Sequence, residues 1–146
     1  MSDKYFIDTN ILMYAHDRSA GLKHDRARQV IERLWLSGQG VLSTQVLQEF
    51  CINLRRKIPR PLPVDEIRRL IQDYLSWEIV VNGPESVLQA LEIEVRYKTS
   101  FWDALILQAA ESANATVLYS EDLAGGQKYG PIQVINPLTN SEAGPK

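Results

Sequence analysis

Four acidic residues lie far apart in the chain but are of a type that could work together. They are Asp8, Glu49, Asp103 and Asp122. Carboxylate oxygens are hard ligands of the kind that Mg²⁺ and Mn²⁺ prefer. Around a divalent cation, such groups can help to neutralise a phosphate, place an attacking nucleophile and stabilise a leaving oxygen. The four acids can do this chemistry only if the fold gathers them in one place.

Asp8 is the most informative of the four. It ends the strand-like run Lys4–Asp8, and Thr9 or Asn10 can cap a helical turn over Ile11–Ala15. A strand this apolar is typical of a parallel sheet covered on both faces, whose carboxyl edge is where open α/β proteins bind ligands. An acid at such a place is unfavourable unless it has a partner such as a cation. A structural role and a functional role both fit Asp8 taken alone.

Each of the other three acids also has a structural explanation. Asp122 lies just past an apolar strand and could be an ordinary turn residue. Asp103 lies one turn into a helix that Ser100 can cap, where the helix dipole favours any acid. Glu49 borders the apolar stripe of its helix and could be a solvated flank position. If the strands before Asp8 and Asp122 are neighbours, however, the two acids project from backbones about 5 Å apart.

Helices and strands alternate along the chain. Strands are expected at Lys4–Asp8, Val41–Ser43, Trp77–Val81, Thr116–Tyr119 and Ile132–Ile135, and helices at Lys23–Leu36, Gln45–Lys57, Val64–Leu75, Glu85–Tyr97 and Phe101–Asn114. Apolar strands separated by helices predict an α/β fold, a three-layer α/β/α sandwich with a mainly parallel five-stranded sheet. We expect one domain over residues 1–139 and a disordered tail over 140–146.

Composition and charge narrow the class of protein. The 146 residues are 45% hydrophobic and 23% charged, which is typical of a globular domain. No apolar run reaches the roughly 18 residues of a membrane span, and the amino terminus lacks the layout of a signal peptide. Cys51 is the only cysteine, which excludes an internal disulfide and a thiolate zinc site. We therefore expect a cytoplasmic protein, and a net charge of −2 means that any polyanion must be attracted locally.

The four acids lie in four ordered segments that together carry a resemblance. The segments are Phe6–Leu12, Leu42–Phe50, Ser100–Leu107 and Leu118–Leu123, followed by a Gly-rich loop and Val134–Leu138. With these segments the chain resembles PIN-domain proteins of the VapC-like toxin ribonuclease type, and the resemblance covers nearly residues 4 to 138. A lone Asp-Thr-Asn would be a weak signal, whereas four segments in the family's order are a strong one. The final Asn-Pro-Leu stands where similar proteins often have phenylalanine, which is a change in packing only.

The resemblance implies a metal-dependent endoribonuclease that uses Mg²⁺ or Mn²⁺. Its acidic metal-binding and catalytic positions correspond to Asp8, Glu49, Asp103 and Asp122, and its supporting positions to Thr9, Asn10 and Ser120. Ser120 stands where the family often has threonine and keeps the same hydroxyl chemistry, while the neighbouring Glu121 has no assigned role. The resemblance further implies the toxin of a toxin–antitoxin pair, with an RNA substrate, a cognate antitoxin and a homodimer. Since no apolar run is long enough to span a bilayer, we expect no membrane partner.

An RNA substrate would need basic residues near the acids. Arg55, Arg56 and Arg60 cluster around the end of the Glu49 helix and are the candidate RNA contacts. The alternative is a solvated helix end, where cations also suit the carboxyl-terminal dipole. His16 and His24 fall in a loop and near a helix start, and a surface role is expected for both.

Three other functions remain open. The chain could be a PIN-like nuclease of RNA processing outside a toxin system, or a non-catalytic PIN-like domain that binds RNA or protein. The four intact acids argue against the second. A phosphatase or phosphotransferase with Asp8 as nucleophile would also begin with a strand-terminal acid. It would usually need a second acid two residues later, where this chain has Asn10.

Overall fold

The structure, a computed structural model, describes residues 3–123 and 126–139, so the expected tail over 140–146 lies outside the described residues. Its sheet has the order β3-β2-β1-β4-β6-β5, and every neighbouring pair is parallel except β5 and β6. The strands are β1 (Tyr5–Ile7), β2 (Gly40–Ser43), β3 (Glu78–Val80), β4 (Val117–Tyr119), β5 (Lys128–Tyr129) and β6 (Ile132–Ile135). The mainly parallel sheet is confirmed, but the expected count of five strands is wrong. The sixth strand, β5, has two residues within the Gly-rich loop, too few for any alternation to reveal it.

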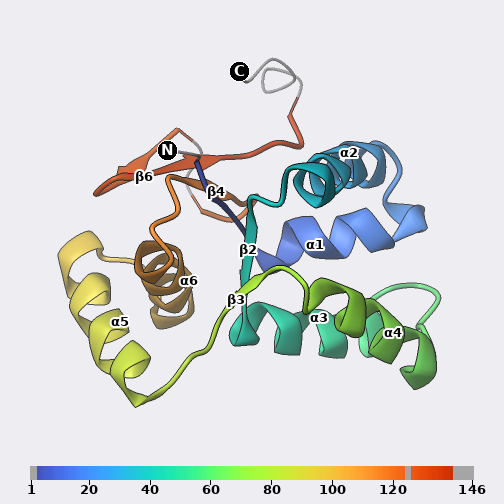
Figure 1. The fold of residues 1–146 in the computed structure, drawn as a ribbon, viewed down its shortest axis with the longest axis horizontal. Helices are drawn as coiled ribbons and strands as arrows, with labels where there is room; N and C mark the ends of the chain where they lie inside the picture. The colour runs from blue at the N-terminus through green and yellow to red at the C-terminus, as the bar shows by residue number, and fades with distance from the viewer. Residues whose placement is uncertain (1–2, 124–125, 140–146) are drawn as a thin grey trace.

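Helices cover both faces of this sheet. They are α1 (Thr9–His16), α2 (Leu22–Ser37), α3 (Thr44–Arg56), α4 (Val64–Tyr74), α5 (Pro84–Tyr97) and α6 (Phe101–Ser112), with a short 3₁₀ turn at Arg18–Ala20. Figure 1 shows α5 and α6 together on one side of the sheet and α1 to α4 on the other, which confirms the three-layer α/β/α arrangement. Among the described residues, no helix is long and apolar enough to cross a membrane.

The central strands are apolar because helices enclose them on both faces. Phe6 and Ile7 of β1, Val41 and Leu42 of β2, and Leu118 of β4 are completely buried. In a one-sided sheet every second residue would face water, and these strands would alternate instead. The uniform burial therefore leaves the ends of the strands, rather than their faces, as the place where polar groups can reach the surface.

Three helices begin directly at, or close to, the carboxyl edge of the sheet, and capping side chains start each of them. Ser43 Oγ accepts a hydrogen bond from Val46 N at the start of α3, and Ser100 Oγ accepts one from Asp103 N at the start of α6. The expectation that Thr9 or Asn10 caps α1 is wrong. Asp8 is the cap, because β1 passes into α1 without a linking residue and Asp8 still has extended backbone angles. The first candidate acid thus has a structural task as well.

Candidate active site

Strands β1 and β4 bring the first and last candidate acids to the same place. The two strands are parallel neighbours, and Ile7 pairs with Tyr119, so Asp8 and Ser120 are the next residues on adjacent strands. Ser120 Oγ donates a hydrogen bond of 2.8 Å to Asp8 Oδ2. Both residues are buried. The carboxyl edge of the sheet therefore holds one carboxylate whose orientation is fixed from the neighbouring strand.

Asp8 is held from its own helix as well. Its Oδ1 accepts a hydrogen bond of 2.7 Å from Thr9 N, and its side chain is almost fully enclosed. Burial raises the pKa of Asp8 from 3.8 to about 6, against the opposing effect of the hydrogen bonds from Ser120 and Thr9. The negative charges of Asp122 and Glu49 raise this pKa further. A carboxylate this buried, with like charges nearby, is a group that gains from a cation.

Glu49 belongs to α3 and contacts the first residue of α1, next to Asp8. Its Oε1 accepts a hydrogen bond of 2.5 Å from Thr9 Oγ1, and its Oε2 accepts one of 3.2 Å from Gln45 Nε2. The flank position expected for Glu49 is thus turned toward the acids and not toward bulk water. Sequence reasoning missed Gln45, which is buried one helical turn before Glu49. Its i, i+4 spacing from Glu49 was the available signal.

Asp122 belongs to a loop that α1 and β4 hold in place. Asn10 Nδ2 donates to Asp122 Oδ2 at 2.9 Å, and Asn10 Oδ1 accepts from Glu121 N at 3.1 Å. Ser120 Oγ accepts from the backbone N of Asp122 and of Leu123, each at 3.2 Å. Thr9, Asn10 and Ser120, the expected supporting residues, therefore contact Glu49, Asp122 and Asp8 respectively.

Asp103 joins the other acids through charge. It lies in the first turn of α6, and burial is the largest effect that raises its pKa. The hydrogen bond with Ser100 lowers this pKa, and the negative charges of Asp122 and Glu49 raise it. The same two acids raise the pKa of Asp8, so the four carboxylates share one electrostatic neighbourhood. Within residues 3–123 and 126–139, however, no three Asp, Glu, His or Cys side chains lie close enough together to hold a metal ion directly.

This donor set fits some cations better than others. Every candidate ligand is a carboxylate, which suits Mg²⁺ or Mn²⁺ and excludes a thiolate site. Mg²⁺ keeps several of its waters and is commonly bound by one or two carboxylates, so it does not need three acids in direct contact. The spacing of the four acids therefore fits a hydrated Mg²⁺ better than a tightly enclosed ion such as structural Zn²⁺.

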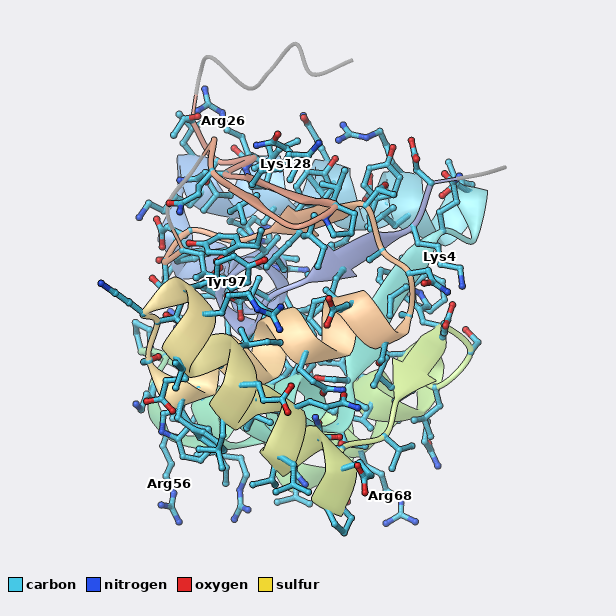
Figure 2. The ribbon with its side chains drawn as sticks, turned by 90° about the vertical axis from the view of Figure 1, so that its left-hand side faces the viewer. Lys4, Arg26, Arg56, Arg68, Tyr97 and Lys128 are labelled. Atoms are coloured by element: carbon cyan, nitrogen blue, oxygen red, sulfur yellow. The ribbon has the colours of Figure 1, made fainter. Side chains whose placement is uncertain are left out.

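The three candidate RNA contacts lie away from the four acids. Arg55 and Arg56 are exposed in the last turn of α3, about two turns beyond Glu49, which corresponds to about 10 Å along a helix. Arg56 extends from the rim of the molecule in Figure 2. Arg60 instead lines a groove of about 890 Å³ together with Arg18 and Arg28. The structure thus separates the basic residues into a helix end and a groove wall.

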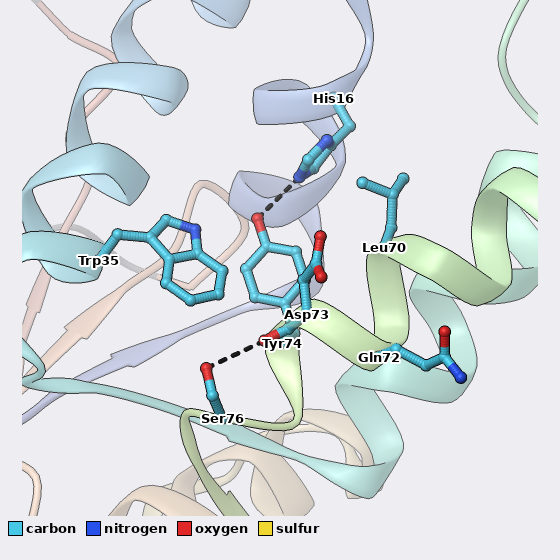
Figure 3. A pocket seen from close by; sticks show the side chains of 7 residues that line it. All are labelled: His16, Trp35, Leu70, Gln72, Asp73, Tyr74 and Ser76. Carbon is cyan, nitrogen blue, oxygen red and sulfur yellow. Dashed lines mark hydrogen bonds between the residues drawn. The ribbon is translucent and has the colours of Figure 1, made fainter.

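A smaller cavity of about 580 Å³ adjoins this groove and contains His16 (Figure 3). The Tyr74 hydroxyl lies 2.7 Å from His16 Nε2, and Phe50 packs against the imidazole at 5.4 Å between ring centroids. Burial lowers the pKa of His16 to about 4, and the nearby His24 contributes to the shift. The expected loop position of His16 is wrong, because α1 extends as far as this residue; its side chain is partly buried against Tyr74 of α4.

Comparison with known proteins places the chain in a family. The sequence profile of the PIN domain matches residues 5–124. A search of curated protein sequences found no match. Among solved structures, the chain is similar to Mycobacterium tuberculosis VapC20, a toxin that cleaves the sarcin-ricin loop, with 22% identity and a TM-score of 0.64. That match covers 82% of this chain and 91% of VapC20.

Two further solved structures share the fold. A toxin–antitoxin complex from Klebsiella pneumoniae matches with 18% identity and a TM-score of 0.68, covering 92% of this chain and 98% of that one. The DNA-bound VapBC of Salmonella typhimurium matches with 15% identity and a TM-score of 0.62, covering 91% and 97%. Identities this low indicate a common fold alone. Together with the profile match over most of its length, they mean that this chain belongs to the PIN-domain family.

Proposed function

We propose that this protein is a Mg²⁺- or Mn²⁺-dependent endoribonuclease and the toxin of a toxin–antitoxin pair. The observation that carries the proposal is Asp8, a nearly fully buried acid at the carboxyl edge of a parallel sheet. The charges of Glu49 and Asp122 act on it, so the negative charge is concentrated where a cation would relieve it. Membership of the PIN-domain family and the likeness to VapC toxins support the same conclusion.

We assign a role to each acid on this basis. Asp8, Asp103 and Asp122 would hold the cation, in part through water, and Glu49 would orient the attacking water or hold a second ion. The bound cation would supply charge neutralisation at the phosphate and a lowered pKa for the attacking water. Ser120 fixes one oxygen of Asp8, and the Thr9 hydroxyl donates a hydrogen bond to Glu49. These hydroxyl groups would keep the carboxylates oriented before the substrate arrives.

The protein partners are part of the proposal. The cognate antitoxin is suggested by the toxin–antitoxin complexes among the similar structures. A homodimer is suggested by the outer face of α5, where the apolar side chains of Leu88, Leu91 and Val95 are 58%, 47% and 79% exposed. Apolar surface of this kind on a small domain is typical of a protein interface.

The direct test is cleavage of end-labelled RNA by the purified chain with Mg²⁺, with Mn²⁺ and with EDTA. We expect internal cleavage products with either cation and none with EDTA. A non-catalytic PIN-like domain would retain the RNA without cutting it. A phosphotransferase would instead leave a labelled phosphoenzyme. Growth arrest on expression, relieved by the product of a small adjacent gene, would separate a toxin from an RNA-processing nuclease.

The basic residues provide a second prediction. Charge reversal at Arg56 and Arg60 together is expected to weaken RNA binding and to flatten its dependence on salt, since each phosphate that is no longer neutralised lowers the slope by about one unit. Filter binding of a catalytically inactive variant between low and moderate salt measures both quantities. Charge reversal at Lys4 is the control, because this residue precedes β1 and so lies at the edge of the sheet opposite the four acids. Unchanged binding at low salt would mean that the RNA path lies elsewhere.

A further inference from the structure

Glu121 lies between two residues of the candidate active site but points away from it. Its Oε1 accepts a hydrogen bond of 2.8 Å from the Tyr14 hydroxyl, and its Oε2 accepts one of 2.5 Å from Lys23 Nζ. Lys23 also lies over the Tyr14 ring, 5.1 Å from the centroid. Three elements therefore meet at one carboxylate: α1 through Tyr14, α2 through Lys23, and the loop after β4 through Glu121.

The neighbouring Asp122 has few constraints of its own. It is exposed, it lies outside every helix and strand, and its carboxylate accepts a hydrogen bond from Asn10. Ser120 fixes the start of the loop by accepting from the backbone N of Asp122 and Leu123. Glu121 adds three contacts with the helical layer: its backbone N donates to Asn10 Oδ1, and its side chain accepts from Tyr14 and Lys23. A shift of Glu121 would move Asp122, because the two residues share a peptide unit.

The carboxylates of Glu121 and Asp122 point toward different partners. Two adjacent acids would repel each other if both faced the same pocket. Here Asp122 is turned toward Asn10 and Glu121 toward Tyr14 and Lys23. The ammonium group of Lys23 compensates the charge of Glu121, so that acid does not compete for the cation expected beside Asp122.

We propose that Glu121 is a positioning residue that works with Tyr14 and Lys23 as a latch, fixing the loop and hence the carboxylate of Asp122. The inference rests on the proposed function, since it takes Asp122 as a metal ligand. Groups that orient a ligand without touching the metal commonly change metal affinity by about tenfold or more when they are removed. The latch should act on metal binding more than on the rate at saturating metal.

The decisive variant is Lys23→Met in the full chain. If Lys23 acted only through its charge, removing a cation would strengthen Mn²⁺ binding. Under the latch it weakens Mn²⁺ binding, with Kd rising by about tenfold. Electron paramagnetic resonance of free Mn²⁺ measures Kd without any turnover. Cleavage at saturating Mn²⁺ should then remain close to that of the unaltered protein.

Three further variants control for other effects. Lys23→Arg keeps a donor and should restore most of the affinity. Tyr14→Phe deletes one hydroxyl, should also raise Kd, and provides a second reading if Lys23→Met unfolds. Glu92→Gln removes an exposed carboxylate from α5, remote from the latch in the sequence, and should leave Kd unchanged.

The experiment distinguishes an error in the proposed metal site from an error in the latch. Unaltered protein that binds no Mn²⁺ would overturn the proposed metal site and the latch with it. Protein that binds Mn²⁺ and cleaves RNA, while folded Lys23→Met and Tyr14→Phe bind Mn²⁺ equally well or better, would overturn the latch and leave the proposed function standing. Weaker binding in both variants, with Glu92→Gln unaffected, is the result that supports it.

Discussion

Replacing Asp8 with asparagine is expected to abolish RNA cleavage while the protein stays folded. The substitution removes the buried negative charge on which the proposed cation depends, and the loss in rate should be roughly a hundredfold to a thousandfold, as for a group that stabilises transition-state charge. The fold should survive because asparagine is as good a helix cap as aspartate, so it can still accept from Thr9 N at the start of α1. Initial rates on labelled RNA, with circular dichroism of the same samples, measure both outcomes.

The matched control is Asp65→Asn, which neutralises an exposed acid in the first turn of α4. It makes the same chemical change without touching the four acids and should leave cleavage within about twofold. Cleavage by Asp8→Asn at the rate of the unaltered protein would remove Asp8 from the site. Loss of folded structure would show instead that the cap depends on the carboxylate charge.

The second large effect is a pH-dependent change in the stability of the metal-free protein. The folded-state pKa of Asp8, about 6, lies above its unfolded value of 3.8, so the folded protein binds the extra proton between these limits. The contribution of Asp8 to stability is therefore fully present below pH 4 and is lost as pH rises through 6. Two pKa units correspond to about 3 kcal/mol.

Asparagine does not titrate, and the difference between the two proteins therefore isolates this effect. At pH 7, the free energy of unfolding of Asp8→Asn should be about 2 kcal/mol higher than that of the unaltered protein. Removing the buried carboxylate charge stabilises the folded state by more than the loss of the hydrogen bond with Ser120 destabilises it. Near pH 4 the order should reverse by about 1 kcal/mol, since only the lost hydrogen bond remains. Urea unfolding with EDTA across this range measures the difference, and a pH-independent difference would contradict the burial argument.

His16 makes the comparison between variants necessary. Its pKa is lowered to about 4 by burial, so it contributes stability that is gained as pH rises from 4 to 6.5. This trend opposes that of Asp8 over nearly the same range, and the unaltered protein alone could show almost no pH dependence. Added Mg²⁺ gives an independent check. At about 100 times Kd it should stabilise the unaltered protein by roughly 3 kcal/mol and Asp8→Asn much less.

The layered fold could be predicted from the sequence because its cause is local. Apolar strands alternate with amphipathic helices, and that pattern alone requires a sheet covered on both sides. The edge strand β5 could not be predicted, because two residues carry no period. The cap of α1, Asp8, lies one residue before Thr9 and two before Asn10, the two expected caps, for a related reason. Composition does not distinguish Asp8, Thr9 and Asn10 as caps, and only the backbone angles do.

Parts of the candidate site could likewise be predicted from the sequence, and parts could not. That an acid ends β1 and another follows β4 is visible in the chain, and the pairing of these strands brings both to one edge. The bonds that orient the acids are not visible, because they join residues far apart. Tyr14 contacts Glu121 across 107 positions and Lys23 contacts it across 98. The burial of His16 depends likewise on α4, which no property of its own segment indicates.

Asp8 caps α1 and is also a proposed metal ligand, and the combination of these two roles has an evolutionary consequence. Aspartate and asparagine codons differ by a single base, and asparagine satisfies the helix equally well. If the proposed role of Asp8 holds, a single-base mutation at this position would convert an active protein into an inactive and more stable one. If activity harms the cell that makes it, the inert form should be among the first survivors recovered from such cells.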